Sequence, residues 1–389
     1  MERAWAITGA GLITTAGDTP EQLFSRILEG RPPTIENGAF PSAAIGDFDP
    51  GKYVKRKGLK YLSRTSQLAC AAASRIGSGL EQERPHEIGF VLGSAWAGLD
   101  TIVNFERRAY VDGPRFVDPG LFAETVANVS AGQVAIFFGW SAVNVTIAAG
   151  TASGLEAILT AIEFLEEDRA HAMVAGGGDG LNPHLLRTLH DEGLTALSSA
   201  SMPYTEGARG PIGSEGACLF VVESVDRAAD RGAPILGRVR AGVSRLIESD
   251  SDDGTAMRAT VLRELLDRCG LAPREVDLLV VSGNGSARRE RTEAAVVREV
   301  FGTDGPAALA PKAVLGETWA AAGPLGVVSA LESMRHATVP AKPPTMKPRQ
   351  EYDALHFPTE PLKRTLHHAL VLDCDESGRF SALVVSGGE

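Results

Sequence analysis

The sequence predicts an α/β fold built from two similar halves. Short apolar runs rich in β-branched residues end in glycine-containing turns, and residues with helical apolar spacing follow them. The 43 glycines among 389 residues suit a chain in which many strands turn tightly into helices. This order of elements occurs in residues 1–230 and again in 231–389, which predicts an internal duplication with one half in each range.

The first half is predicted from a run of strand and helix signals. Thr19 is a helix N-cap, Pro20 stands at the first helical position and Gly30 follows the end of that helix. Apolar runs and helical spacing predict the remaining elements. Strands are expected over 4–8, 88–93, 143–149, 172–175 and 218–223, and helices over 101–110, 130–138 and 155–168.

The second half repeats these signals and ends in a hairpin. Strands alternate with helices as in the first half, and turns at 282–286 and 312–317 join them. Strands are expected over 239–247, 277–281, 368–373 and 380–386, and helices over 253–269, 292–301 and 320–336.

Composition and charge argue against several classes of function. A net charge of −11 argues against a nucleic-acid partner. No apolar run approaches the roughly 20 residues that span a bilayer, so we expect no membrane association and a cytoplasmic location. The glycines at 9 and 11 lack the third glycine of a dinucleotide site, so no cofactor is predicted. The four cysteines are far apart, which predicts neither disulfides nor a metal site: Cys70, Cys218, Cys269 and Cys374.

The turn at residues 150–154 is the most informative stretch. It consists of small residues between a predicted strand and a predicted helix, so it presents one side chain, that of Thr151, at the helix N-terminus. Free N–H groups and the helix dipole favour negative charge there. Such a turn presents a nucleophile beside an oxyanion site.

This turn resembles the active site of the β-ketoacyl synthases, members of the thiolase superfamily. Their pattern is Thr-Ala-Cys-Ser/Ala-Ser-Gly, and this chain has Ala-Gly-Thr-Ala-Ser-Gly at 149–154, so Thr151 stands where the acyl-carrying cysteine belongs. Pro203-Tyr-Thr and the glycine-rich segment 210–216 also match the family in outline. The resemblance implies a thiolase-like five-layer α-β-α-β-α fold from two duplicated halves.

The resemblance also implies that both catalytic histidines are replaced. The family's His-Gly-Thr-Gly-Thr-x-x-x-Asp-x-x-Glu frame begins here at Ser282, with Glu290 and Glu293 at the acidic positions. Its Lys-Ser-x-x-Gly-His frame runs from Lys312 to Glu317. No catalytic residue is therefore intact: Thr151, Ser282 and Glu317 are degenerate positions.

The chemistry of these replacements disfavours condensation. A threonine hydroxyl needs an adjacent base to act as a nucleophile, and the imidazoles that stabilise an enolate are missing. A carboxylate at Glu317 would repel developing negative charge unless it were protonated. We therefore interpret Thr151 and Ser153 as structural hydroxyls of the helix turn, with a nucleophilic Thr151 as the alternative.

Further pocket and docking residues follow from the same resemblance. Glu376 takes the place of the family's gating phenylalanine, with Cys374 near it, while Ser153 and Lys312 would line the pocket. In related synthases the segment before Asn128 reaches the partner's acyl pocket, which indicates Leu121 and Phe122 as length-setting residues or, alternatively, as ordinary interface residues. A basic stretch is either a solvated face or a dock for acyl carrier protein: Lys55, Arg56, Lys57, Lys60 and Arg64.

The combined expectation is a non-catalytic ketosynthase-like subunit. It resembles the chain-length factors of type II polyketide synthases, which pair with an active ketosynthase as a heterodimer and shape the acyl pocket. Two alternatives stay open. One is a homodimeric acyltransferase or hydrolase that acts on acyl-carrier-protein thioesters through Glu317, Ser282 or Thr151, and the other is an acyl-binding protein without chemistry.

Overall fold

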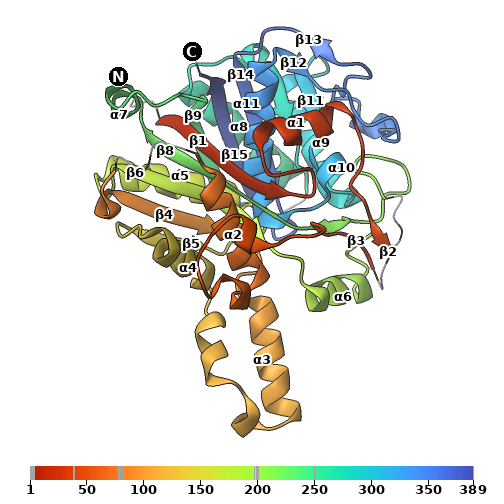
Figure 1. Cartoon of the computed structure of the whole chain (residues 1–389). Coiled ribbons are helices and arrows are strands. Elements are labelled where there is room, and N and C mark those ends of the chain that lie inside the picture. The colour runs from red at the N-terminus through yellow and green to blue at the C-terminus, as the bar shows by residue number, and fades with distance from the viewer. Residues whose placement is uncertain are drawn as a thin grey trace.

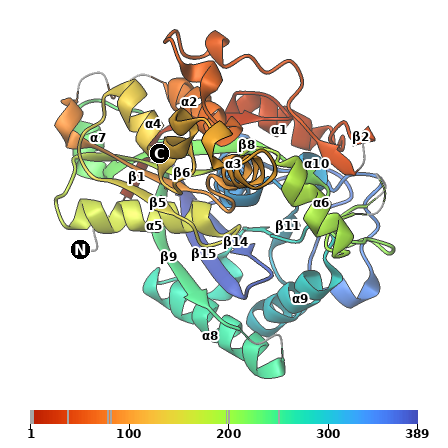
Figure 2. The same cartoon turned by 90° about the horizontal axis from the view of Figure 1, so that it is seen from below.

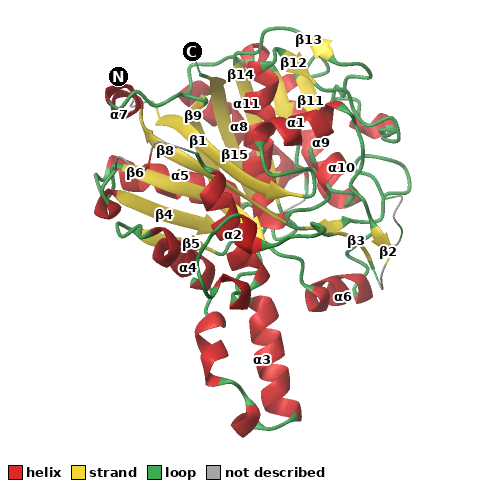
Figure 3. Ribbon diagram, viewed as in Figure 1, coloured by secondary structure: helices red, strands yellow, loops and turns green. Residues whose placement is uncertain are grey.

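The computed structural model describes residues 5–37, 40–77, 80, 83–196, 198, 201–248 and 251–388. One large sheet runs through the centre of the molecule, and helices cover it on both sides (Figure 1, Figure 3). Its ten strands have the order β11-β10-β14-β15-β9-β1-β8-β6-β4-β5. No helix in the described part of the chain is long and apolar enough to cross a membrane.

The first half supplies the strands at one side of this sheet. β1 is antiparallel to β8, and β4 is parallel to β5 and β6. The strands are β1 (Trp5–Thr14), β4 (Ile88–Gly93), β5 (Asn144–Ile147), β6 (Ala172–Asp179) and β8 (Gly216–Ser224). The helices are α1 (Pro20–Leu28), α2 (Arg64–Arg75), α3 (Leu99–Val111), α4 (Val129–Phe138), α5 (Ser153–Glu166), α6 (Pro183–Asp191) and α7 (Val225–Asp230). A small three-stranded sheet joins β2 (Glu36–Asn37), β3 (Pro41–Ala43) and β7 (Gly213–Ser214).

The second half supplies the other side of the sheet. β10 is parallel to β11 and β14, and β15 is antiparallel to β14 and β9. The strands are β9 (Gly237–Leu246), β10 (Leu278–Val280), β11 (Ala307–Leu309), β14 (His368–Cys374) and β15 (Arg379–Gly387). The helices are α8 (Asp252–Arg268), α9 (Ala287–Phe301), α10 (Lys312–Leu315) and α11 (Ala322–Arg335). β12 (Thr338–Val339) pairs with β13 (Leu362–Lys363).

The two halves share one topology. If the five large-sheet strands of each half are numbered in chain order, both halves have the spatial order 1-5-4-2-3. In each half a long helix, α5 or α11, lies in the chain between the third and fourth of these strands. The halves meet where β1 pairs with β9. The predicted division at residue 230 itself stays a prediction.

Three apolar cores separate the layers. Buried side chains of α1, α5 and α11 form the central core, between the sheet portions of the two halves. Residues of α2 and α4 form an outer core on the first half, and residues of α8 and α9 form one on the second half. Figure 2 shows α2 and α4 on one side of the molecule, α8 and α9 on the other and α5 between them. The expected thiolase-like arrangement of five layers is confirmed.

The first half contains an open sheet edge and a projecting arm. β5 is the last strand of the large sheet, so one side of it has no strand neighbour in the described chain. α3 and the short helical turns at Pro114–Phe116 and Pro119–Glu124 form an arm that projects from the body (Figure 1). None of the α3 residues is buried.

Most predicted elements occur with shifted ends. β1 continues to Thr14, six residues beyond its predicted end, because it pairs with β8 along its whole length. α9 begins at Ala287 rather than at residue 292. The alanine-rich α2 and the short α6 were not predicted, and the strand at β11 was also missed because its three residues carry little periodic signal.

Candidate functional site

In the turn before α5, the uncharged side chain of Thr151 is hydrogen-bonded to the backbone. Gly150 has a φ of 74°, a conformation that favours glycine. The Ser153 hydroxyl donates to the Gly150 carbonyl at 2.6 Å and accepts from the Ala149 N–H at 2.8 Å. The Thr151 hydroxyl donates its hydrogen bond to the Cys374 carbonyl at 3.1 Å and not to a basic side chain. Thr151 is 8% exposed.

Close packing brings the first half against the second at this turn. A Cβ atom on Gly154 would lie 1.9 Å from the carbonyl oxygen of Ala320, so only glycine allows this approach. Ala320 lies in the short helical turn just before α11. The N-terminal ends of α5 and α11 therefore meet, and the site contains residues of both halves.

The loop at residues 282–286 keeps its shape through buried carboxylates of α9. Glu293 accepts from the Ser282 N–H at 2.6 Å, and Glu290 accepts from the Gly285 N–H at 2.7 Å. The Tyr204 hydroxyl donates to Glu293 and accepts from the Gly283 N–H. The two acidic positions that the sequence indicated thus hold the loop in place.

Four buried charged side chains lie together near Ser282, which is one of the two predicted replacements of a histidine, and include Glu317, which is the other. We call Arg289, Lys312, Glu317 and Asp373 the four-charge cluster. Lys312 Nζ lies 3.0 Å from a Glu317 oxygen and 3.8 Å from Asp373 Oδ1. Arg289 lies 3.6 Å from Glu317 and 3.5 Å from Asp373. All four side chains are at most 7% exposed, so the two cations pair with the two carboxyl groups away from water.

The cluster also binds Ser282, one of the three predicted degenerate positions. Ser282 donates to Asp373 at 3.1 Å and accepts from Arg289. The Cys374 N–H donates to the Ser282 hydroxyl at 3.0 Å. Because Thr151 bonds the carbonyl of Cys374, this one residue joins the two halves of the site. The structure therefore brings Thr151, Ser282 and Glu317 into one connected network.

The carboxylates of the cluster differ in their acidity. Burial raises the pKa of Asp373 to about 7, although Lys312 and Arg289 oppose this change. Burial also opposes the ionisation of Glu317, but Lys312 and Arg289 outweigh it and hold the pKa of Glu317 below its usual value. Glu317 is consequently an ionised, paired carboxylate and not the protonated group that would tolerate a nearby oxyanion.

Hydrogen bonds occupy both oxygens of Glu317. One accepts from the Trp319 N–H at 3.0 Å, and the other accepts from Asn284 at 2.8 Å and from Lys312. Trp319 has a φ of 54°, an uncommon conformation for a tryptophan, which turns its N–H toward Glu317. The carboxylate is fixed and has little freedom to act as a base.

Two cavities reach this region. One has about 20 Å³, room for roughly one water molecule, and it is lined in part by Arg289, Glu293 and Cys374. The other has about 300 Å³ and reaches Lys312 and Glu317 from the side of Pro203. Thr151 lines neither of them. The nucleophile position and the larger cavity are therefore separate.

The remaining predicted pocket residues lie in different surroundings. Glu376 is exposed in the turn between β14 and β15 and lines the small cavity. Leu121 and Phe122 lie on the arm, where they are 36% and 63% exposed, and the Phe122 ring is 6.2 Å from that of Phe105. These two residues are not part of the four-charge network in the single chain.

The basic stretch divides into exposed residues and one inward-facing arginine. Lys55, Lys57 and Lys60 are exposed, and Arg56 is exposed and donates to the Ile136 carbonyl. Arg64 differs from these residues, and its place on a docking surface stays a prediction. Its guanidinium is bound to both oxygens of the buried Glu215, because an ion pair with a carboxylate satisfies that buried charge.

Sequence reasoning missed three residues of the site. Arg289 lies within the quoted motif and Tyr204 within the Pro203-Tyr-Thr segment, but neither was recognised as part of the network. Asp373 is the next-to-last residue of the apolar β14, and a lone carboxylate in such a run was a usable signal. The partners of these side chains are distant in sequence, so spacing alone did not reveal them.

Comparisons with known proteins agree with this arrangement. The β-ketoacyl synthase N-terminal domain matches residues 37–228, and the β-ketoacyl synthase C-terminal domain matches residues 245–345. The 3-oxoacyl-[acyl-carrier-protein] synthase 2 of Coxiella burnetii is 25% identical, with 99% of each chain covered. The actinorhodin polyketide β-ketoacyl synthase 1 of Streptomyces coelicolor is 26% identical, covering 100% of this chain and 90% of its own.

Solved structures show the same fold. The ishigamide ketosynthase/chain length factor superposes with a TM-score of 0.91 at 21% identity, and a β-ketoacyl synthase from Burkholderia phymatum superposes with a TM-score of 0.86 at 18% identity. Both matches cover 100% of each chain. Two matching family domains along the chain, full-length relatives and a shared five-layer fold lead to one conclusion: this chain belongs to the β-ketoacyl synthase family.

Proposed function

We propose that this chain is a non-catalytic ketosynthase-like subunit, a chain-length factor, which pairs with an active ketosynthase and shapes its acyl or polyketide pocket. The observation that carries this proposal is the four-charge cluster, which stands where condensation requires neutral imidazoles. The Streptomyces coelicolor relative is named as a polyketide β-ketoacyl synthase, which supports polyketide or fatty-acid-like biosynthesis as the setting.

The cluster opposes each chemical step of condensation. Enolate formation and thioester attack both develop negative charge, which donors from neutral imidazoles stabilise. Here the ionised Glu317 faces the site, and its pairing uses the charge of Lys312 and Arg289. The Thr151 hydroxyl has a carbonyl acceptor and no basic partner, so it lacks the activation that a nucleophile needs.

A second candidate function draws on the cavity of about 300 Å³ at Lys312 and Glu317. An acyltransferase or hydrolase acting on acyl-carrier-protein thioesters would use Glu317 as its base. The lowered pKa of Glu317 and its occupied oxygens disfavour this role, because a general base works best with a pKa near the working pH.

Activity measurements distinguish these functions. The chain is incubated with malonyl- and acyl-carrier protein, alone and with a ketosynthase encoded beside it, and β-ketoacyl products and free acids are analysed by mass spectrometry. We expect neither product from the chain alone. Thr151→Cys alone should not restore condensation, because both histidine positions remain filled by Ser282 and Glu317. Condensation by the chain alone that survives Thr151→Ala would contradict the proposal, and acid release lost in Glu317→Gln would favour the second candidate.

We propose the edge strand β5 and the projecting arm as the partner surface. An open sheet edge is a template for pairing with another chain. The arm exposes apolar side chains that a lone chain would leave in water: Tyr110 at 94%, Phe116 at 52% and Phe122 at 63% exposure. A partner that covers both features would form a two-fold or pseudo-two-fold dimer.

The partner surface is tested with arm variants. Tyr110→Ser and Phe116→Ser together should weaken the complex with the ketosynthase at least tenfold, since buried aromatic residues dominate interface energies. Tyr61→Ser is the matched control, because Tyr61 is 74% exposed but lies outside the arm. Light scattering measures the mass of the complex, and sedimentation measures how tightly it forms. An unchanged affinity in the double variant, or a strictly monomeric chain with every ketosynthase partner, would count against this surface.

We propose Leu121 and Phe122 as the residues that set product length. Their exposure on the arm supports a place inside the partner's pocket. A bulky side chain at the end of a tunnel stops a growing chain, because overlap in a packed interior costs roughly 1–3 kcal/mol. Leu121→Ala and Phe122→Ala should shift the products of the reconstituted complex to longer chains. Lower yield with an unchanged length profile, normalised to intact dimer, would identify them as interface residues only.

Carrier-protein docking on Lys55, Arg56, Lys57 and Lys60 is the remaining part of the proposal. Their exposure on an otherwise acidic chain supports an acidic partner. Lys55→Glu with Lys57→Glu should slow reconstituted turnover at low salt more than at high salt, because screening weakens such contacts. An effect equal at all salt concentrations would argue for a solvated face instead.

A further inference from the structure

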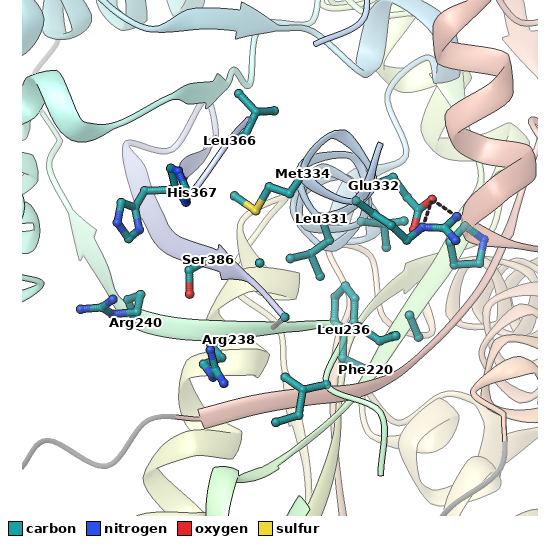
Figure 4. A pocket seen from close by; sticks show the side chains of 18 residues that line it. Phe220, Leu236, Arg238, Arg240, Leu331, Glu332, Met334, Leu366, His367 and Ser386 are labelled. Atoms are coloured by element: carbon teal, nitrogen blue, oxygen red, sulfur yellow. Dashed lines mark hydrogen bonds and ion pairs between the residues drawn. The ribbon is translucent and has the colours of Figure 1, made fainter. Parts of the chain in front are cut away.

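A cavity of about 490 Å³ lies far from the four-charge cluster (Figure 4). It is lined near the C-terminal end of α11 by Leu331 and Met334, and near the start of β14 by His368. Asp373 of the cluster lies five residues along the same strand, so roughly 17 Å of extended chain separates the two places. The function proposed above makes no use of this cavity.

The cavity has an apolar part and a cationic part. Figure 4 shows Leu236, Leu331 and Phe220 in one part, and Arg238 and Arg240 in the other. The carboxylate of Glu332, which also lines the cavity, is already paired with Arg335. The free charge that remains at the wall is therefore positive.

The cationic part contains polar groups that the described chain leaves unsatisfied. Arg238 has no hydrogen-bond or ion-pair partner among the described residues. Arg240 donates to the Cys269 carbonyl at 3.3 Å and is otherwise exposed. The Nδ1 atom of His368 is buried without a partner. Strand register places His368, Ser386 and Arg238 side by side across β14, β15 and β9.

Burial, and then the nearby Arg240, lower the pKa of His368. The imidazole is therefore neutral near pH 7 and adds hydrogen-bonding capacity without a further charge. Two guanidinium groups, a hydroxyl and a neutral imidazole stand together at one side of the cavity: Arg238, Arg240, Ser386 and His368.

We propose that this cavity binds a small amphipathic carboxylate, with its head on Arg238 and Arg240 and its apolar body along Leu236 and Leu331. A guanidinium matches a carboxylate with two parallel hydrogen bonds. A volume of about 490 Å³ falls in the range of small-molecule sites, and apolar walls with a few convergent polar groups are typical of them. A ligand without an apolar body would leave Leu331 and Met334 uncovered.

The test uses octanoate as the probe and isothermal titration calorimetry on the full chain. We expect saturable binding of one octanoate, and we expect Arg238→Gln to weaken it about tenfold or more. Arg245→Gln is the matched control, because Arg245 is an exposed arginine on the same strand, outside the cavity. Leu236→Glu should also weaken binding, and Leu236 is 41% exposed, so this change leaves the core intact.

Competing probes make the assignment specific. Octylamine and octanol should not displace octanoate, and acetate should bind at least tenfold more weakly. Absence of octanoate binding at millimolar concentration would overturn the proposal. So would binding that both Arg238→Gln and Leu236→Glu leave unchanged, or inorganic phosphate binding as tightly as octanoate, which would indicate a simple anion site. Unchanged thermal unfolding of each variant verifies that the fold is retained.

Discussion

The two helices at the centre of the molecule begin in contrasting surroundings, although they occupy equivalent places in the two halves. α5 begins at Ser153, just after Thr151, and the uncharged hydroxyls of both residues bond backbone groups. α11 follows Glu317, a buried carboxylate held by Lys312 and Arg289. One half of the site is thus stabilised by hydrogen bonds from uncharged hydroxyls and the other by buried charge.

This difference means that the proposed loss of a condensing site takes a different form in each half. Placing threonine where the family has cysteine exchanges a thiol for a hydroxyl and leaves the shape of the turn, which Gly150 and Gly154 determine. The second half holds four charges contributed by α9, α10, β14 and the segment before α11. Its electrostatics therefore cannot be reversed by one substitution.

Removing one charge of the cluster is the strongest test of this comparison. We expect Arg289→Met to lower the free energy of unfolding by about 3–5 kcal/mol, because two buried carboxylates, Glu317 and Asp373, would share Lys312 alone. Urea unfolding gives the change. The exposed Arg291 of the same helix is the matched control, and Arg291→Met should change stability by about 0.5 kcal/mol or less. If the two variants lowered the free energy of unfolding equally, the cluster would contribute no more to stability than an exposed arginine does.

The pH dependence of stability tests the same cluster through Asp373. Its folded pKa of about 7 lies above the ordinary value of 3.8, so the folded chain holds a proton that the unfolded chain releases. Stability from this group is present below pH 4 and is lost as the pH rises toward 7. Relative to Asp373→Asn, the native chain should lose on the order of 2 kcal/mol between pH 5 and 7. If the difference in unfolding free energy between the two chains stayed constant with pH, the raised pKa of Asp373 would be contradicted.

The smallest effect is expected at the hydroxyl side of the site. Thr151→Val removes one hydrogen bond to Cys374 and should cost about 1 kcal/mol in urea unfolding. Thr151→Ser keeps the hydroxyl and should cost less. If Thr151→Val cost as much as Arg289→Met, the contrast between the two halves would disappear.

The part of the fold that could be predicted consists of single helices and strands with a clear local pattern. The strand at Ile88–Gly93 and the helix from Pro20 were recognised from an apolar run and from a cap. The pairing of β1 with β9 could not be predicted, since residues far apart in sequence form it. α2 was missed because a run of alanines gives no clear apolar stripe.

The sequence indicated three positions that the structure brings together, but it did not indicate the charges around them. The family motifs indicated Thr151, Ser282 and Glu317, and the structure joins them through Cys374 and Arg289. The sequence expectation treated Glu317 as a repelling charge. Its neutralisation depends on Arg289, which a helix turn of α9 directs inward, and no spacing rule identifies such a contact in advance.

The open edge at β5 has a consequence for the amount of this protein that a cell can keep folded. A chain with an unpaired edge strand and an arm of exposed aromatic side chains resists aggregation only as long as something covers them. Its apparent stability then depends on the concentration of whatever binds there. Synthesis in excess over a binding partner would leave orphan chains for chaperones and proteases to clear. If the proposed partner covers this sheet edge, the folding of this chain depends on the supply of that partner.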